Sequence, residues 1–146
     1  MMLKHVVTLI TILLISGCSS LVLQPQPSSV NSQQATAGST GVSAVDKLIA
    51  KGDVQRRQGD YRNAAATLER ALRLSPQSGG AYLALSRVRL DQKSYGEALQ
   101  LAEKSLSLSA DSKRAQKEAW LVISEVKKRR GDINGSLEAA KKARRL

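Results

Sequence analysis

The chain has 146 residues, of which 42% are hydrophobic and 24% are charged, a balance typical of a single globular domain. Its formal net charge is +11, it has no phenylalanine, and it contains one cysteine and one histidine. A single cysteine excludes an internal disulfide framework, and one residue of each kind cannot build the usual zinc sites.

The first seventeen residues have the pattern of a secretory signal peptide. Lys4 and His5 form a short basic region, an apolar run covers residues 6–15, and small residues precede Cys18. The run is too short for a permanent transmembrane helix, which needs about 20 apolar residues. The segment Ile15–Cys18 resembles a bacterial lipobox, which implies cleavage before Cys18 and diacylation of its sulfur. The alternative is that Cys18 is incidental in a plain signal or anchor segment.

Lipidation of Cys18 limits the kinds of catalytic and metal-binding site that the mature chain can form. His5 leaves with the signal peptide and the lipid blocks the only thiol, which excludes catalysis by histidine or cysteine and metal sites built from them. The twelve acidic residues form no paired-carboxylate pattern. We therefore expect no enzyme, and no cofactor or metal besides the lipid on Cys18. Ser19 resembles the sorting residue of outer-membrane lipoproteins, which implies an outer-membrane location facing the periplasm.

Residues 18–44 are predicted to form a disordered, lipid-anchored linker. From Ser19 to Val45 no residue is charged, and the stretch is rich in Ser, Gln, Gly, Thr and Pro. Without periodic apolar residues it has little to bury. A flexible chain of about 25 residues has a typical reach of roughly 25–30 Å, which would hold a domain away from the membrane.

Residues 45–146 contain three copies of one pattern. The segment that begins at Gly52 aligns with the segment from Ser86 at an offset of 34 residues, and that segment aligns with the one from Ser124 at an offset of 38. Small side chains at fixed spacing let two antiparallel helices approach closely, while larger residues on the same face fill the space between them. Three columns hold only small residues: Gly52, Ser86 and Ser124; Ala64, Ala98 and Ser136; Ala71, Ser105 and Ala143.

This pattern resembles the tetratricopeptide repeat (TPR), a helix–turn–helix unit of 34 residues. The resemblance implies an all-α solenoid of three helical hairpins, with repeats at about 45–78, 79–112 and 113–146. Three repeats are about the minimum for a stable array, because each unit buries its apolar face only on its neighbours. The third repeat has four extra residues, so its first helix should be longer. Six helices are expected, over residues 44–58, 61–74, 79–92, 95–108, 112–129 and 133–145.

The aromatic residues and the last helix have two possible roles each. The aromatic side chains fall in packing columns, which favours core positions over ligand binding: Tyr61, Tyr82, Tyr95 and Trp120. In the last repeat Arg144 takes the place of two leucines, Leu72 and Leu106, and Lys141 takes that of two glutamates, Glu69 and Glu103. These changes predict that the final helix is its own solvent-facing cap. The alternative is that a partner covers it.

TPR domains bind peptides or proteins in a concave groove lined by the first helix of each repeat. The resemblance implies that an apolar row lies on this groove beside charges of both signs. The sequence lacks the Lys/Asn pattern by which some members hold a C-terminal carboxylate, so that activity is not expected. By position, the groove residues are Ile49, Asp53 and Arg56; Leu83, Arg87 and Leu90; and Leu121, Glu125 and Lys128.

Positive charge is concentrated in the last repeat. Residues 113–146 have eleven basic and four acidic side chains, whereas residues 79–112 have four of each. A basic patch attracts acidic protein surfaces or segments, anionic lipid headgroups or an anionic envelope polymer within a screening distance of about 8–10 Å. Nucleic acid is disfavoured, because the chain has an export signal and the basic runs lack stacking aromatic residues. The predicted patch contains Lys127, Lys128, Arg129, Arg130, Lys141, Lys142, Arg144 and Arg145.

Together these features predict a membrane-anchored, non-enzymatic TPR lipoprotein that docks proteins during cell-envelope assembly, with peptidoglycan-synthesis, secretion or pilus components as candidate partners. The alternative is a pilotin-like or chaperone-like carrier of an outer-membrane secretion or pilus component. Two surfaces remain candidates for binding, the concave groove and the basic C-terminal residues.

Overall fold

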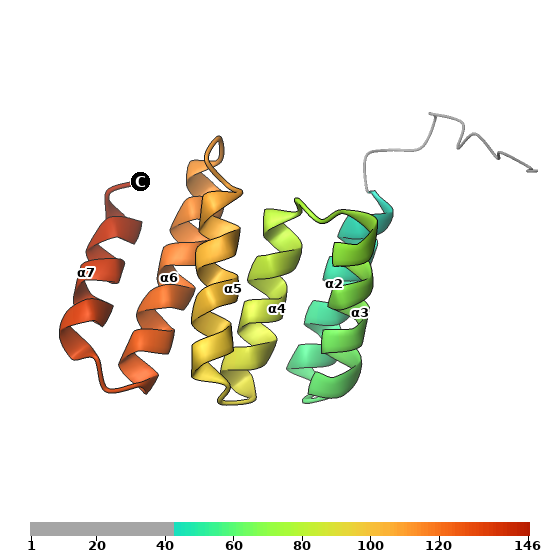
Figure 1. The fold of residues 1–146 in the computed structure, drawn as a ribbon, viewed down its shortest axis with the longest axis horizontal. Coiled ribbons are helices and arrows are strands. Elements are labelled where there is room, and N and C mark those ends of the chain that lie inside the picture. The colour runs from blue at the N-terminus through green and yellow to red at the C-terminus, as the bar shows by residue number, and fades with distance from the viewer. Residues whose placement is uncertain (1–42) are drawn as a thin grey trace, which may run out of the picture. The chain divides into compact units, whose positions relative to one another are not determined.

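The computed structural model describes residues 43–146, which form six α-helices joined by short turns (Figure 1). The predicted signal peptide, Cys18 and the linker as far as residue 42 lie outside the described residues. The helices are α2 (Ala44–Arg57), α3 (Tyr61–Leu74), α4 (Gly79–Asp91), α5 (Tyr95–Ser107), α6 (Lys113–Arg129) and α7 (Ile133–Arg144). The predicted all-α repeat fold is confirmed, and each helix ends within one residue of its predicted bounds.

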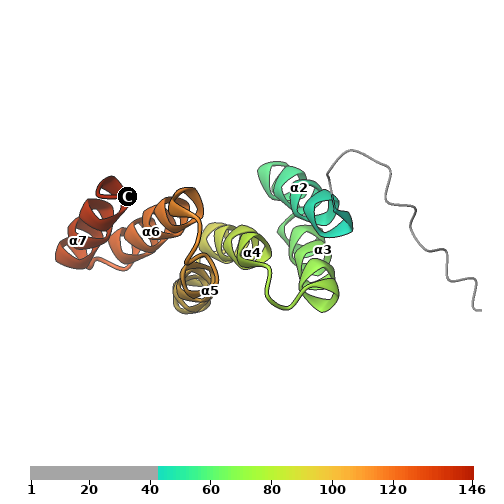
Figure 2. The same cartoon turned by 90° about the horizontal axis from the view of Figure 1, so that it is seen from above.

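The helices pair as three antiparallel hairpins, α2–α3, α4–α5 and α6–α7, stacked in chain order (Figure 2). The second helix of each of the first two hairpins packs on the first helix of the next hairpin. Of the first helices, α4 also contacts both α2 and α6, while among the described helices α3, α5 and α7 do not contact one another. The first helices therefore line the inner face of the array.

Local signals set the helix boundaries. Ser43 and Asp46 form a capping box at the start of α2, in which each side chain bonds the backbone N–H of the other residue. Asp60 and Asp132 cap α3 and α7 through one bond each, in which a carboxylate oxygen accepts from a backbone N–H three residues on. Ser112 caps α6, which has 17 residues and is the longest described helix. The four extra residues of the third repeat thus lie at the start of this hairpin, as expected.

The small-residue columns lie where helices meet. Ala64, Ala98 and Ala71 are fully buried, and so are Ser86 and Ser105. The buried serines need partners for their hydroxyl groups, because an unpaired polar group in a core is costly. Ser86 Oγ donates to the Leu83 carbonyl at 2.7 Å and Ser105 Oγ donates to the Gly79 carbonyl at 2.8 Å. Small polar residues therefore permit close helix contact without an unsatisfied group.

Three of the four aromatic residues lie at the edge of the core. Tyr61 packs against the cluster around Leu68, and Tyr95 and Trp120 pack against the cluster around Ile123. All three are half-buried, and so is Tyr82. The Trp120 ring also has the Lys142 Nζ atom 4.4 Å from its centroid, a cation–π contact across the last hairpin. Their placement in packing columns is thus consistent with a mainly structural role.

The turn within each hairpin needs one residue in the left-handed region. Gly59 and Gly131 have φ values of +79° and +82°, and the equivalent residue of the second repeat is Lys93, with φ of +63°. A side chain with a Cβ atom is strained in this conformation, whereas glycine is not. Lys93 therefore stores backbone strain in the middle repeat.

Replacement of Lys93 by glycine is expected to raise the free energy of unfolding by about 0.5–1 kcal/mol, because relief of strain outweighs the entropy of a more flexible unfolded chain. Urea denaturation of the full-length protein, followed by circular dichroism, measures the change. The reverse change, Gly59→Lys, is the matched control and should lower stability. A loss of stability in Lys93→Gly would contradict this account of the turn.

Candidate functional site

A groove of about 370 Å³ lies on the inner face, between α2, α4 and the start of α6. Ile49 and Leu83 form its apolar floor, with one side chain from each of the first two repeats. Gly80 lies beside this floor, where a Cβ atom would be in ordinary contact with Ile49 Cδ1 at 3.5 Å. The full lining is Asp46, Ile49, Ala50, Asp53, Gly80, Leu83, Ala84, Arg87 and Glu118. Four of the nine predicted groove residues thus lie together.

A second hollow of about 220 Å³ lies toward the other end of the same helices. It brings Leu90 and Glu125 together, two more of the predicted groove residues. Its lining also includes the last residues of α4 and α6, the first residues of α3 and α5, and one turn residue: Asp91, Arg129, Tyr61, Tyr95 and Lys93. The predicted groove is therefore divided into two hollows with different linings, one with an apolar floor and one that is mostly polar.

The other three predicted residues lie outside these hollows. Leu121 is on α6, in the row of Ile49 and Leu83, and its side chain is 49% exposed. Lys128 is exposed near the end of α6. Arg56 is held in ion pairs at the edge of α2, described next. Leu121 extends the apolar row beyond the first hollow, whereas Lys128 contributes to neither.

Ion pairs between repeats occupy the charged residues of this face. Arg56 Nη1 lies 2.7 Å from Asp91 Oδ2, and Arg56 Nη2 lies 3.1 Å from Asp53 Oδ1. Burial acts to lower the pKa of Arg56, but its hydrogen bonds with Asp91 and Asp53 outweigh this and raise it. These contacts join the first repeat to the second, so Arg56 acts as a bridge between repeats.

A similar bridge joins the second repeat to the third. Arg87 Nη2 lies 3.1 Å from Glu118 Oε2, and Glu118 also accepts from Arg114 Nε at 3.3 Å. These side chains are at least one-third exposed, so each pair contributes at most about 1 kcal/mol to stability. The main effect of these ion pairs is to hold Arg87 and Glu118 at the rim of the groove.

Five lining residues of the first hollow were not predicted: Ala50 and Ala84, which each follow a residue of the apolar row, and Asp46, Gly80 and Glu118. Each of the last three stands three positions before a residue of the apolar row, which is Ile49, Leu83 or Leu121. Residues three apart lie on the same side of a helix, so this spacing could have identified them. These three positions place two carboxylates and a glycine along one edge of the groove.

The two basic runs of the predicted patch lie at opposite ends of the last hairpin. The run 127–130 ends α6 beside the turn, whereas the run 141–145 ends α7 near the C-terminus (Figure 1). Along α7 the two runs are about 15 Å apart, at 1.5 Å per residue. This exceeds the screening length of about 8 Å at physiological salt. The structure therefore does not bring the eight residues together as one patch.

Several of these basic side chains have acidic or aromatic neighbours. Lys127 Nζ lies 3.3 Å from Asp132, Arg129 Nε lies 2.6 Å from Glu125, and Lys141 Nζ lies 2.8 Å from Glu138. Hydrogen bonds from the Gly135 N–H and from Lys127 lower the pKa of Asp132. Lys128, Arg130, Arg144 and Arg145 are exposed. The exposed basic side chains that could bind a partner are thus divided between the two ends of the last hairpin.

The described residues also bear on membrane and metal binding. Within residues 43–146, no helix combines the length and hydrophobicity needed to span a bilayer. In the same range no three His, Cys, Asp or Glu side chains converge as metal ligands would.

Comparisons with known proteins point to one family. A tetratricopeptide-repeat model matches residues 49–115. The globular C-terminal domain of LpoP from P. aeruginosa is similar in structure, with a TM-score of 0.66 and 32% sequence identity. The match covers 68% of this chain and 94% of that domain. No curated protein matches the sequence.

Proposed function

The chain belongs to the tetratricopeptide-repeat family, and from this premise we propose that it docks another envelope protein in the groove between α2, α4 and α6. TPR domains are protein-interaction modules, which supports binding in general. The choice of the groove rests on one observation. Ile49 and Leu83 form an apolar floor between charged rims, the arrangement expected of a site that takes an apolar side chain from a partner segment.

We also propose that a lipid on Cys18 holds the domain at the membrane, facing the periplasm. The lipobox-like segment Ile15–Cys18 and the uncharged linker support this, because they provide an attachment point followed by a spacer. The resemblance to the C-terminal domain of LpoP fits the same order along the chain, with the globular domain after an N-terminal segment. The resulting function is a tethered, non-enzymatic docking module for cell-envelope assembly.

Variants of one residue at the rim of the groove and of Leu121, which extends the apolar row beside it, test the docking proposal without disturbing the core. Leu121→Ser and Arg87→Glu are expected to lower the amount of an envelope protein that co-purifies with the full-length protein by about tenfold or more, because they remove apolar contact or add a carboxylate beside Glu118. The matched control is Leu74→Ser, on α3, where the leucine is 58% exposed. Equal co-purification in all three variants would exclude the groove as the docking site.

A further inference from the structure

The outer face of α7 has apolar residues at positions that the next hairpin covers in the first two repeats. In the first two hairpins the equivalent face of the second helix packs on the next hairpin, α3 on α4 and α5 on α6 (Figure 2). The counterparts of Ile133 are Tyr61 and Tyr95, and those of Leu137 are Ala65 and Leu99; all four pack against the core clusters. Ile133 and Leu137 are instead 55% and 53% exposed. Within residues 43–146 nothing covers this apolar pair.

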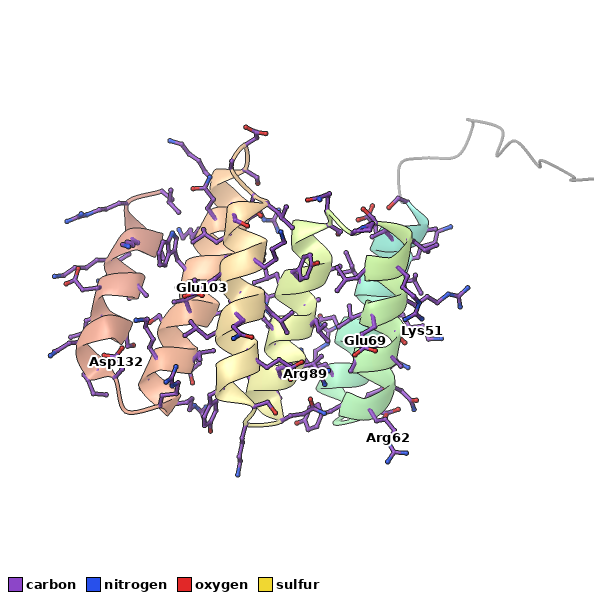
Figure 3. The ribbon with its side chains drawn as sticks, in the orientation of Figure 1. Lys51, Arg62, Glu69, Arg89, Glu103 and Asp132 are labelled. Atoms are coloured by element: carbon purple, nitrogen blue, oxygen red, sulfur yellow. The ribbon has the colours of Figure 1, made fainter. Side chains whose placement is uncertain are left out.

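One charge beside this face is opposite in sign to the charge at the same position of the internal repeats. Glu69 of α3 accepts a hydrogen bond from Arg89 of α4 at 3.2 Å, across the boundary between the first two repeats (Figure 3). Lys141 stands at the position of Glu69 on α7. A helix that packed on α7 as α4 packs on α3 would therefore need a carboxylate where α4 has Arg89.

At a second position a basic side chain replaces an apolar one. Arg144 stands where Leu72 and Leu106 pack against the core clusters. Glu138 lies 2.8 Å from Lys141, but both side chains are exposed, and such a pair is weak. Lys142 lies over the Trp120 ring of α6, so Lys141 and Arg144 supply the positive charge beside Ile133 and Leu137.

Two occupants are disfavoured by charge. Residues 1–42 of this chain contain no aspartate or glutamate, so that segment has no carboxylate for Lys141 or Arg144. A second copy stacked head to tail would present α2, where Lys47 and Lys51 stand at the positions of Ala81 and Leu85. Lys51 would then face Arg144, while Gln55 would take the place of Arg89 beside Lys141, so a second copy offers no carboxylate to this face.

We propose that the outer face of α7 docks an acidic amphipathic helix of another protein, which occupies the place that α4 occupies on α3. Its apolar side chains cover Ile133 and Leu137, and its carboxylates pair with Lys141 and Arg144. This surface lies on the second helix of its hairpin, away from the groove of the proposed function. The inference goes beyond that function and does not depend on it.

Photo-crosslinking from position 137 of the full-length protein in intact cells tests the proposal. A photoreactive residue in place of Leu137 is expected to link to one segment of another protein, and mass spectrometry should identify that segment as negatively charged with apolar residues three and four apart. Charge reversal by Lys141→Glu with Arg144→Glu should lower the yield of this product by about tenfold. The matched control is Arg62→Glu with Arg70→Glu on α3, an equal change in net charge that should leave the yield unchanged.

The outcomes separate this inference from the groove proposal. A product that forms from position 121 but not from position 137 overturns the α7 surface and leaves the groove proposal intact. Linkage to a second copy of the chain, or to a basic segment, also overturns it. A yield that the Lys141 and Arg144 reversal does not change shows that the charges do not select the partner, which contradicts the proposal as well.

Discussion

Replacement of Leu68 by alanine is expected to lower the free energy of unfolding by about 2–5 kcal/mol. Leu68 is 0% exposed and lies in the core cluster that joins α3 to α4, so its removal deletes buried apolar contacts and leaves a cavity. Natural domains are stable by only about 5–15 kcal/mol, so this loss is a large fraction of the total. Urea denaturation of the full-length protein, followed by circular dichroism, measures it.

The single tryptophan adds a second probe, because Trp120 lies in the third repeat and Leu68 in the first. In a repeat array each unit is stabilised by its neighbours, so a weakened first repeat can unfold before the last. We expect the dichroism midpoint of Leu68→Ala to fall below the Trp120 fluorescence midpoint. The matched control is Leu74→Ala, an exposed leucine on the same helix, which should change stability by no more than about 0.5 kcal/mol. Similar losses in both variants would contradict the assignment of Leu68 to the core.

Gly52 provides a coupled test of the same contact. A Cβ atom at Gly52 would lie 2.6 Å from Leu68 Cγ, so Gly52→Ala overpacks the α2–α3 contact and should cost about 1–3 kcal/mol. Gly96→Ala is the matched control, because no atom lies within 4 Å of a Cβ there. In the double variant with Leu68→Ala the clash disappears, so the two losses should not add.

Replacement of Cys18 by serine is expected to abolish lipid attachment and to release the protein from the membrane fraction. A serine hydroxyl does not accept the diacylglyceryl group that a lipoprotein cysteine thiol receives, so no acyl chain would hold the variant at the membrane. Two lipid signals or more are needed for stable anchoring, and the full-length protein would lose all of its acyl chains. Metabolic labelling with a fatty-acid analogue, together with membrane fractionation, measures both effects.

The control for this variant keeps a thiol in the chain but moves it. Cys18→Ser combined with Ser20→Cys places the thiol two residues beyond the lipobox-like segment, and we expect no labelling and no return to the membrane. If Cys18→Ser alone left labelling and membrane partitioning unchanged, Cys18 would not be the anchor. The helical domain should fold in all of these variants, since residues 43–146 form their own core.

The repeat periodicity predicted the fold closely because each signal in it is local. Small residues at Ala64 and Ala98 let a neighbouring helix approach closely, and Asp60 and Asp132 after a glycine supply turn and N-cap chemistry at the start of a helix. The resemblance to the tetratricopeptide repeat supplied the order in which the hairpins stack. Helix bounds and hairpin pairing therefore follow from residues that lie within about 34 positions of one another.

The site was predicted less completely because its properties depend on pairs of residues from different repeats. Arg56 was expected to face the groove as a single charge, whereas it bridges to Asp91, 35 residues away. The two basic runs were predicted to form one patch because both lie in the last repeat. The antiparallel hairpin places them at opposite ends of that repeat. The strain at Lys93 was also not predicted, because the positive φ that makes the alignment of Lys93 with Gly59 and Gly131 informative is a property of the folded turn.

The most direct test of the tethered docking module is photo-crosslinking from position 121, in intact cells, of the full-length protein with and without Cys18. The account predicts a product with an envelope protein from position 121, none from position 74 on α3, and a marked loss of the product in Cys18→Ser. Products of equal yield from positions 121 and 74, or a product from position 121 that does not depend on Cys18, would contradict it.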